Sequence, residues 1–154
     1  MCPARTSKAP AKSERKPAVG SEIAPGVFVG GWKEAVAFDG ERFCVLDEKP
    51  EDMPQGTHIP IYDDASDRPI VENLDRVASA MHAARVRDRP VIVFCGHGVR
   101  RSPMAGAWYL HRYENLSLDD AYARIRAVRP KVEHARDWLG DPSPLEAPSR
   151  KGSR

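Results

Sequence analysis

The segment from Val91 to Tyr113 constrains the fold of this chain more than any other. Val91 to Phe94 are four consecutive apolar residues between turn signals, a pattern typical of a strand buried on both faces. The next six residues, from Cys95 to Arg100, include two glycines and predict a tight loop. From Ser102 the sequence predicts a helix, with Pro103 at an early position where proline is tolerated.

The remaining elements alternate in the same way. Apolar residues repeat every three or four positions from Ile70 to Ala84, which predicts a helix, and Ser117 with Asp120 opens another in the manner of a capping box. Further expected elements are strands at 27–30 and 42–46, a helical turn at 32–38, a polar loop at 63–69, and a last short helix at 133–139. A brief extended segment is expected at 58–61, where Pro60 argues against a central, fully paired strand. This order predicts a single α/β domain with a central, mainly parallel sheet flanked by helices.

Charge and composition predict tails on either side of one domain. The chain has 154 residues, a length that suits a single core. Residues 1–20 carry a net charge of +4 and 141–154 carry +1, which leaves −3 for the part between them. We therefore expect a disordered basic tail over 1–20, a folded domain over 21–140 and a flexible tail over 141–154.

The cysteines and the apolar runs suggest a cytoplasmic protein. Cys2, Cys44 and Cys95 are an odd set without metal-ligand spacing, so neither a zinc site nor a disulfide framework is indicated. Cys44 lies within an expected strand and is read as a core residue. No apolar run is long enough to span a membrane, and no secretory signal is recognised at the N-terminus.

The loop after the buried strand carries the residues that predict chemistry. A loop between a strand and a helix turns successive backbone N–H groups inward and forms an anion-binding nest at the positive end of the helix dipole. Gly96 and Gly98 allow the close backbone approach that such a nest requires. Arg101 can bind two phosphate oxygens, the positive surroundings favour the nucleophilic thiolate of Cys95, and Ser102 can donate a hydrogen bond to the sulfur.

The run from Cys95 to Ser102 matches C-x-x-G-x-x-R-[ST], and the chain resembles the protein tyrosine and dual-specificity phosphatases. Weaker matches follow in family order, namely the run 23–30, the Ile-Pro-x-x-Asp stretch ending at Asp63, and Ala121 with Arg129-Pro130. The resemblance covers roughly residues 22–139. One position differs, because most members have His before the nucleophile and this chain has Phe94.

The resemblance implies a phosphatase that works through a phosphocysteine on Cys95, without metal or cofactor. It also implies an Asp general acid about thirty residues before the cysteine. Asp63 lies 32 residues before Cys95 and is the first choice, with Asp64 and Asp67 as alternatives. The expected catalytic residues are Cys95, Arg101, Asp63 and Ser102, and the expected substrate-binding residues are Gly96, His97, Gly98, Val99 and Arg100.

The expected partner is a phosphorylated protein, bearing phosphotyrosine and also phosphoserine or phosphothreonine. A nucleic-acid partner is not expected, and a monomer is favoured. Alternatives on the same loop are an RNA 5′-triphosphatase, which the pair His97-Gly98 resembles, and a phosphoinositide phosphatase. A rhodanese-like sulfurtransferase and a phosphate-binding module without turnover also remain open. For the two extra basic groups, we expect Arg100 to point to solvent and His97 to pack against a neighbour.

Overall fold

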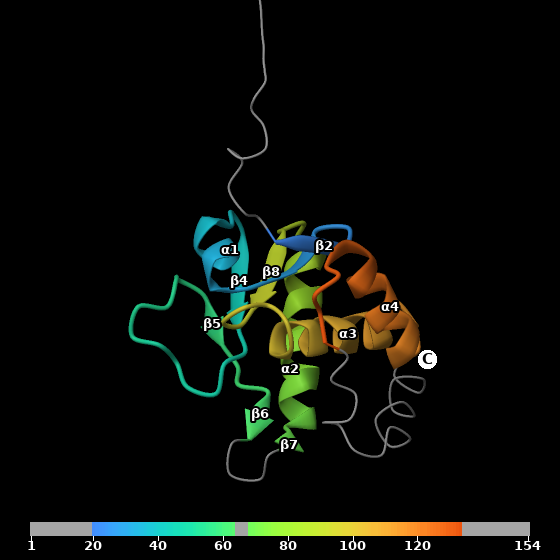
Figure 1. The fold of residues 1–154 in the computed structure, drawn as a ribbon. Helices are drawn as coiled ribbons and strands as arrows, with labels where there is room; N and C mark the ends of the chain where they lie inside the picture. The colour runs from blue at the N-terminus through green and yellow to red at the C-terminus, as the bar shows by residue number, and fades with distance from the viewer. Residues whose placement is uncertain (1–19, 64–67, 134–154) are drawn as a thin grey trace, which may run out of the picture.

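The computed structural model describes residues 20–63 and 68–133, which form one layered α/β unit (Figure 1). The strands are β2 (Ser21–Ala24), β3 (Val27–Gly30), β4 (Glu41–Cys44), β5 (Thr57–His58), β6 (Tyr62–Asp63), β7 (Arg68–Pro69) and β8 (Val91–Phe94). The helices are α1 (Trp32–Ala37), α2 (Val71–Val86), α3 (Arg101–Tyr113) and α4 (Leu118–Val128).

The central sheet has the strand order β2-β3-β8-β4-β5. Strand β8 lies in the middle and pairs in parallel with β3 and β4, and β4 pairs in parallel with β5. Only β2, at one edge, runs antiparallel to its neighbour β3. The prediction of a mainly parallel sheet flanked by helices is therefore confirmed.

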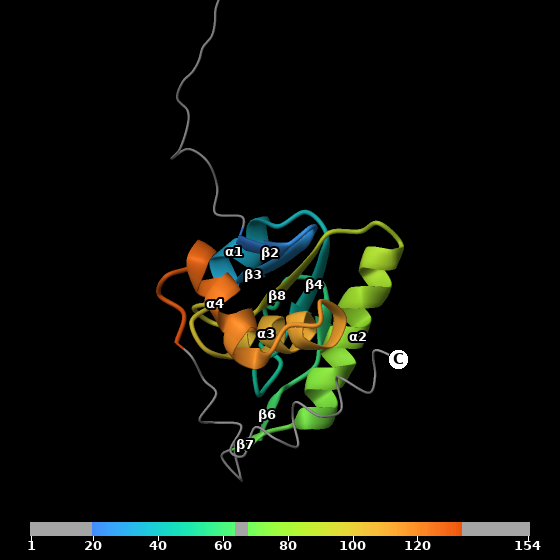
Figure 2. The same ribbon diagram turned by 90° about the vertical axis from the view of Figure 1, so that its right-hand side faces the viewer.

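Helices cover both faces of the sheet, which explains the uninterrupted apolar sequence of β8. Val91 and Val93 face the larger cluster of buried side chains, which includes those of α2, α3 and α4. Ile92 and Phe94 face the smaller cluster, to which α1 contributes Ala35. The turned view in Figure 2 shows α1 on one side of the strands and α2 and α3 on the other.

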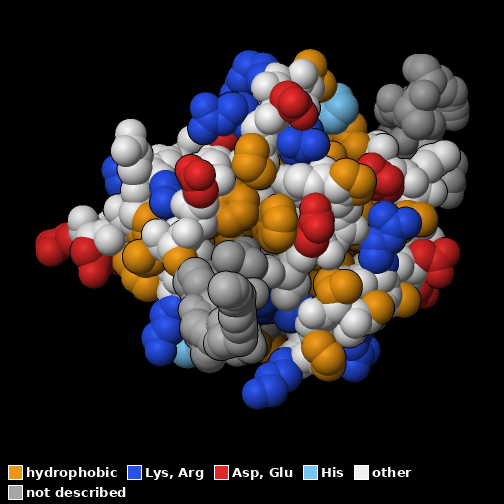
Figure 3. Space-filling view, turned by 90° about the horizontal axis from the view of Figure 1, so that it is seen from above, with side chains coloured by type: hydrophobic (Ala, Val, Ile, Leu, Met, Phe, Trp, Pro, Cys, Tyr) orange, Lys and Arg blue, Asp and Glu red, His pale blue; other side chains and the backbone are white. Residues whose placement is uncertain are grey.

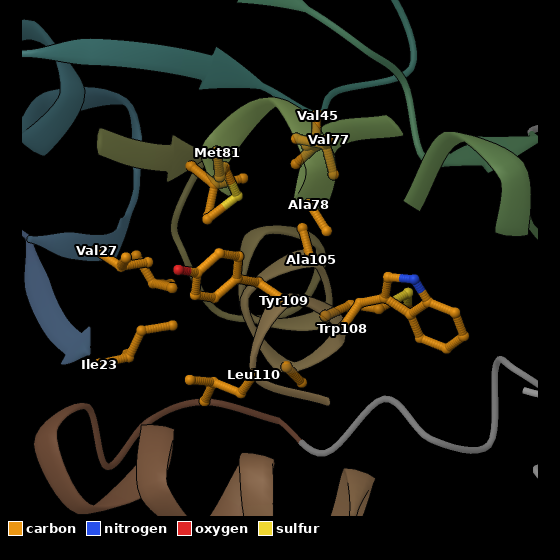
Figure 4. Close-up of a cluster of buried hydrophobic side chains, with 14 of the residues drawn as sticks. Ile23, Val27, Val45, Val77, Ala78, Met81, Ala105, Trp108, Tyr109 and Leu110 are labelled. Atoms are coloured by element: carbon orange, nitrogen blue, oxygen red, sulfur yellow. The ribbon is translucent and has the colours of Figure 1, made fainter. Parts of the chain in front are cut away.

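Helix α3 occupies the centre of the larger cluster (Figure 4). Trp108, Tyr109 and Leu110 are all buried; the Tyr109 ring points toward the side chains of β2 and β3, and the Trp108 ring points to the opposite side. The indole Nε1 of Trp108 donates a hydrogen bond to Asp75 on α2 at 2.7 Å, and Arg112 pairs with the same carboxylate. This packing fixes the helix whose first turn borders the predicted loop.

Several elements differ from the sequence-based expectation. The first sheet strand, β2, was not expected, because Ser21–Ala24 shows no clear alternation of apolar and polar residues. The expected polar loop at 63–69 has strand residues at both of its ends. These belong to β6 and β7, which pair antiparallel with Tyr62 opposite Pro69 and Asp63 opposite Arg68. Most of the expected helix at 133–139 and both expected tails, apart from Gly20, lie outside the described residues.

Helix α4 begins where the capping pattern predicted. The Ser117 Oγ accepts a hydrogen bond from the Asp120 N–H at 3.1 Å, and the helix ends before Arg129. On the face in Figure 3, basic and acidic side chains are interspersed, so no single-sign patch dominates that face. None of the described helices is long and apolar enough to cross a bilayer.

Candidate active site

The parallel strands bring three chain segments together at their carboxyl ends. Gly30 at the end of β3 and Cys44 at the end of β4 both stand opposite Phe94 at the end of β8. The residues that follow these three strands, Gly31, Val45 and Cys95, therefore lie at the same end of the sheet. Open α/β sheets bind their ligands at this end, beyond the carboxyl ends of the strands.

The sulfur of Cys95 lies inside a turn of backbone N–H groups. The Gly98 N–H donates to Cys95 Sγ at 3.3 Å, and the Ser102 N–H donates to the same atom at 3.4 Å. The second donor belongs to the first turn of α3, whose free N–H groups carry the positive end of the helix dipole. Cys95 is 5% exposed, so the sulfur is enclosed but reachable.

Ser102 connects the sulfur to the neighbouring strand. Its Oγ lies 3.4 Å from Cys95 Sγ, which donates to it, and it donates in turn to the Gly30 carbonyl at 2.8 Å. Ser102 is fully buried. The hydroxyl is thus held in contact with the sulfur at the position that the sequence predicted.

Gly98 is a glycine because the loop turns back on the sheet at this residue. Its φ is +72°, a conformation that residues with a side chain rarely adopt. A Cβ atom at this position would stand 2.6 Å from the Gly30 carbonyl carbon and 2.8 Å from the Gly31 nitrogen. Both the backbone angle and the available space therefore require glycine.

The Arg101 side chain lines the same pocket as Cys95. Its Nη2 donates to Asp47 Oδ2 at 3.4 Å, and its Cζ stands 5.2 Å from the centroid of the Tyr62 ring. Its buried Nε has no hydrogen-bond partner within the part of the chain that the structure describes. A buried donor in this state suits an anion with two or more oxygen atoms.

The loop is supported from behind by an ion pair that the sequence analysis did not identify. Arg129 Nε donates to the Gly98 carbonyl at 2.8 Å, and Nη2 donates to the His97 carbonyl at 3.3 Å. The same guanidinium binds both carboxylate oxygens of Glu34, at 2.7 and 2.9 Å. The only signal in the sequence was the family-like Arg129-Pro130 pair.

Glu34 in turn caps its own helix. Its Oε1 accepts a hydrogen bond from the Gly31 N–H at 2.7 Å, at the start of α1. Burial by itself raises the pKa of Glu34, but the hydrogen bonds from Arg129 and from the Gly31 N–H outweigh it, so the pKa of Glu34 is lowered. The ionised pair therefore fixes the backbone beneath His97 and Gly98.

Most residues of the loop line a pocket of about 220 Å³. Its wall includes Cys95, Gly96, His97, Val99, Arg100, Arg101 and, from the β4 side, Leu46. Arg100 is exposed as expected and pairs with Glu133 at 3.2 Å. His97, which was expected to pack against a neighbour, is exposed, and its carbonyl accepts a hydrogen bond from Arg129 Nη2 at 3.3 Å.

The expected acid residues are described only in part. Asp63 forms the end of β6, directly after Tyr62, whose ring packs on Arg101. Asp64 and Asp67 lie outside the described residues. No group of three or more His, Cys, Asp or Glu within 20–63 and 68–133 is arranged to hold a metal ion.

Phe94 and Cys44 both point away from the pocket. The Phe94 ring packs edge-on against Trp32, with the centroids 6.0 Å apart, in the cluster beneath α1. Cys44 belongs to the same cluster and is fully buried, which confirms the prediction of a core residue. Burial raises the pKa of the Cys44 thiol, and the nearby Cys95 adds to this shift, so Cys44 is held as the neutral thiol.

Comparison with known proteins identifies the family. The model of the dual specificity phosphatase catalytic domain matches residues 44–140. The chain is 30% identical over 132 residues to mouse dual specificity phosphatase 28, covering 79% of this chain and 80% of the relative. It is 28% identical over 143 residues to the human protein of the same name, a match that covers 86% of this chain and 80% of the human protein.

A solved structure shares this fold. The crystal structure of human DUSP28 superposes with a TM-score of 0.67 at 23% sequence identity, over 83% of this chain and 99% of that one. The match to the dual specificity phosphatase catalytic domain and the mouse relative set aside the sulfurtransferase alternative. The catalytic-domain model matches most of the described residues, and the mouse relative is similar over most of its length. The chain therefore belongs to the dual specificity phosphatase family.

Proposed function

We propose that this phosphatase hydrolyses phosphate monoesters on proteins, phosphotyrosine first and phosphoserine or phosphothreonine as well, through a phosphocysteine on Cys95. One observation carries the proposal: Cys95 Sγ accepts hydrogen bonds from the Gly98 and Ser102 N–H groups and lies in a pocket that Arg101 also lines. The catalytic unit in this proposal spans residues 21–140.

In the first step, the Cys95 thiolate attacks the phosphorus atom. The loop N–H groups that surround the sulfur stabilise the thiolate, and they bind the phosphate oxygens as the P–S bond forms. Arg101 holds two of those oxygens through Nε and one Nη. The P–O bond to the substrate breaks as the P–S bond forms, and the departing oxygen takes a proton from Asp63.

The assignment of the acid to Asp63 is supported by its neighbour. Tyr62 packs on Arg101 at 5.2 Å, so the chain segment that carries Asp63 runs past the phosphate-binding arginine. Asp64 is the second candidate and Asp67 the third.

In the second step, water attacks the phosphocysteine. Asp63, now ionised, accepts a proton from that water, the P–S bond breaks and phosphate is released. The departing sulfur becomes a thiolate again. Ser102 Oγ lies 3.4 Å away and, by turning its proton from the Gly30 carbonyl toward Sγ, stabilises that thiolate.

A substrate panel with Cys95→Ser as the blank tests the proposal. The panel contains peptides with phosphotyrosine, phosphoserine or phosphothreonine, a phosphoinositide and a 5′-triphosphate RNA. We expect phosphate release from the phosphopeptides, fastest from phosphotyrosine, and none with Cys95→Ser, since an alcohol is far less ionised than a thiol. A trapped phosphocysteine, seen as an added phosphate mass on the Cys95 peptide, identifies the intermediate.

Other results would lead to other functions. Release from the phosphoinositide or the RNA alone would assign the loop to that substrate instead. Binding of phosphopeptides without hydrolysis would make the domain a phosphate-binding module. If Cys95→Ser kept more than a few per cent of the activity, the phosphocysteine mechanism would be wrong.

A further inference from the structure

The Arg101 guanidinium is held from two directions by residues outside the loop. Asp47 follows β4, and its Oδ2 accepts from Arg101 Nη2 at 3.4 Å. Tyr62 belongs to β6, and its ring lies against the guanidinium face, 5.2 Å from Cζ. One contact acts on an edge of the planar group and the other on a face, so together they restrict both its position and its tilt.

Both contacts lie in partly buried surroundings. The Arg101 and Asp47 side chains are 29% and 23% exposed, so water and salt screen their pairing less than they screen a pair on the open surface. Tyr62 is half-buried. A cation over an aromatic ring gains strength when water is removed from around it.

The two contacts leave a defined part of Arg101 for another ligand. Its Nε is buried and has no hydrogen-bond partner within 20–63 and 68–133, although Arg101 lines the pocket. An arginine side chain has many rotamers, and an anion that binds a mobile arginine must also immobilise it. A guanidinium that is already fixed binds the same anion more tightly.

We propose that Asp47 and Tyr62 are positioning residues that hold Arg101 by one edge and one face, with Nε left for the substrate phosphate. This inference rests on the proposed role of Arg101 as the phosphate-binding side chain. Neither residue takes part in a bond-making step. Asp47 acts as a hydrogen-bond acceptor, and Tyr62 acts through its ring.

Tungstate, an oxyanion that cannot be turned over, is the probe. Its dissociation constant is measured by calorimetry on the full chain. We expect Asp47→Ala and Tyr62→Leu each to weaken tungstate binding by about 3- to 10-fold, the range for one partly buried contact of this kind. Asp47→Asn, which keeps an acceptor oxygen, and Tyr62→Phe, which keeps the ring, should stay within about twofold of the wild type.

A spectroscopic measurement separates positioning from a general folding defect. The Arg101 Nε–H resonance is assigned by its loss in Arg101→Lys. It should be sharp in the wild type and in Asp47→Asn, and broadened in Asp47→Ala and Tyr62→Leu. The matched control is Asp52→Ala, an exposed aspartate on the same loop as Asp47, which should change neither the resonance nor the affinity.

Two results would overturn the inference. Tighter binding in Asp47→Ala would mean that Asp47 competes with the phosphate for Arg101. A sharp Arg101 resonance with unchanged affinity in both Asp47→Ala and Tyr62→Leu would mean that neither residue positions it. A failure of the underlying mechanism has a different signature, since Arg101→Lys would then bind tungstate as tightly as the wild type.

Discussion

Arg129→Ala tests the support beneath the phosphate-binding loop. The substitution removes a guanidinium that donates to the Gly98 carbonyl at 2.8 Å, to Ser21 Oγ at 3.0 Å and to both oxygens of Glu34. It leaves the Glu34 carboxylate partly buried without its cation. We therefore expect a loss of stability together with a loss of order in the loop.

The size of the effect follows from burial. The Arg129 and Glu34 side chains are 16% and 19% exposed. Breaking a fully buried ion pair costs about 3–5 kcal/mol, and the residual exposure reduces this to about 2–3 kcal/mol. In a domain of this size each kcal/mol lowers the melting temperature by about 4 °C, so we expect a decrease of about 8–12 °C.

Thermal unfolding followed by circular dichroism, at several pH values, is the assay. The pKa of Glu34 is lowered in the folded state, so its contribution to stability is present above its ordinary value of 4.5 and is lost as the pH falls through the folded pKa. The gap between wild type and Arg129→Ala should therefore narrow in acid. Arg126→Ala, at an exposed position of α4, is the matched control.

Two outcomes would contradict this reasoning. A melting temperature equal to that of Arg126→Ala would mean that the ion pair contributes nothing to the fold. A gap that stayed constant from neutral pH into acid would mean that the loss does not involve the charge of Glu34.

Three further predictions concern the chemistry. Arg101→Lys should lower kcat/KM nearly as much as Arg101→Ala, because an ammonium group cannot donate two parallel hydrogen bonds to the phosphate oxygens as a guanidinium does. Near-normal turnover in Arg101→Lys would mean that Arg101 does not bind the phosphate in this way. Asp63→Asn should slow hydrolysis of a tyrosyl phosphate by ~10²–10⁴-fold but affect an activated aryl phosphate far less, because its leaving group needs no proton. Equal effects on both substrates would mean that Asp63 is not the general acid, and Asp64→Asn would then be tested in the same way. Activity should survive EDTA and be inhibited by vanadate and by peroxide, which oxidises the Cys95 thiolate; dependence on an added divalent ion in the same assay would count against the mechanism.

Local sequence patterns predicted much of the fold, because they coincide with burial. The apolar run of β8, the spacing along α2 and the capping residues of α4 all produced elements close to their expected positions. The hairpin of β6 and β7 was missed, since it rests on two residue pairs and carries no periodic signal. The edge strand β2 was missed for a similar reason.

The candidate site was predictable where it is continuous in sequence. Cys95, Gly98 and Ser102 lie within eight residues, and their spacing alone predicted that they meet. Glu34 and Asp47 could not be found in this way, because an isolated acidic residue resembles any solvated surface group. They approach the loop only through the parallel pairing of the strands, which brings distant segments to one edge.

The hydrogen bonds of Arg129 also set when the loop can be completed during synthesis. This residue lies 108 positions after Ser21 and 95 after Glu34, and it follows the Cys95 loop by about 30 residues. A chain emerging from the ribosome presents β3, β8 and the nucleophile long before the residue that supports them. Contacts of such long range also form slowly. The newly made chain can therefore complete the hydrogen bonds beneath the loop only after the end of α4 has emerged.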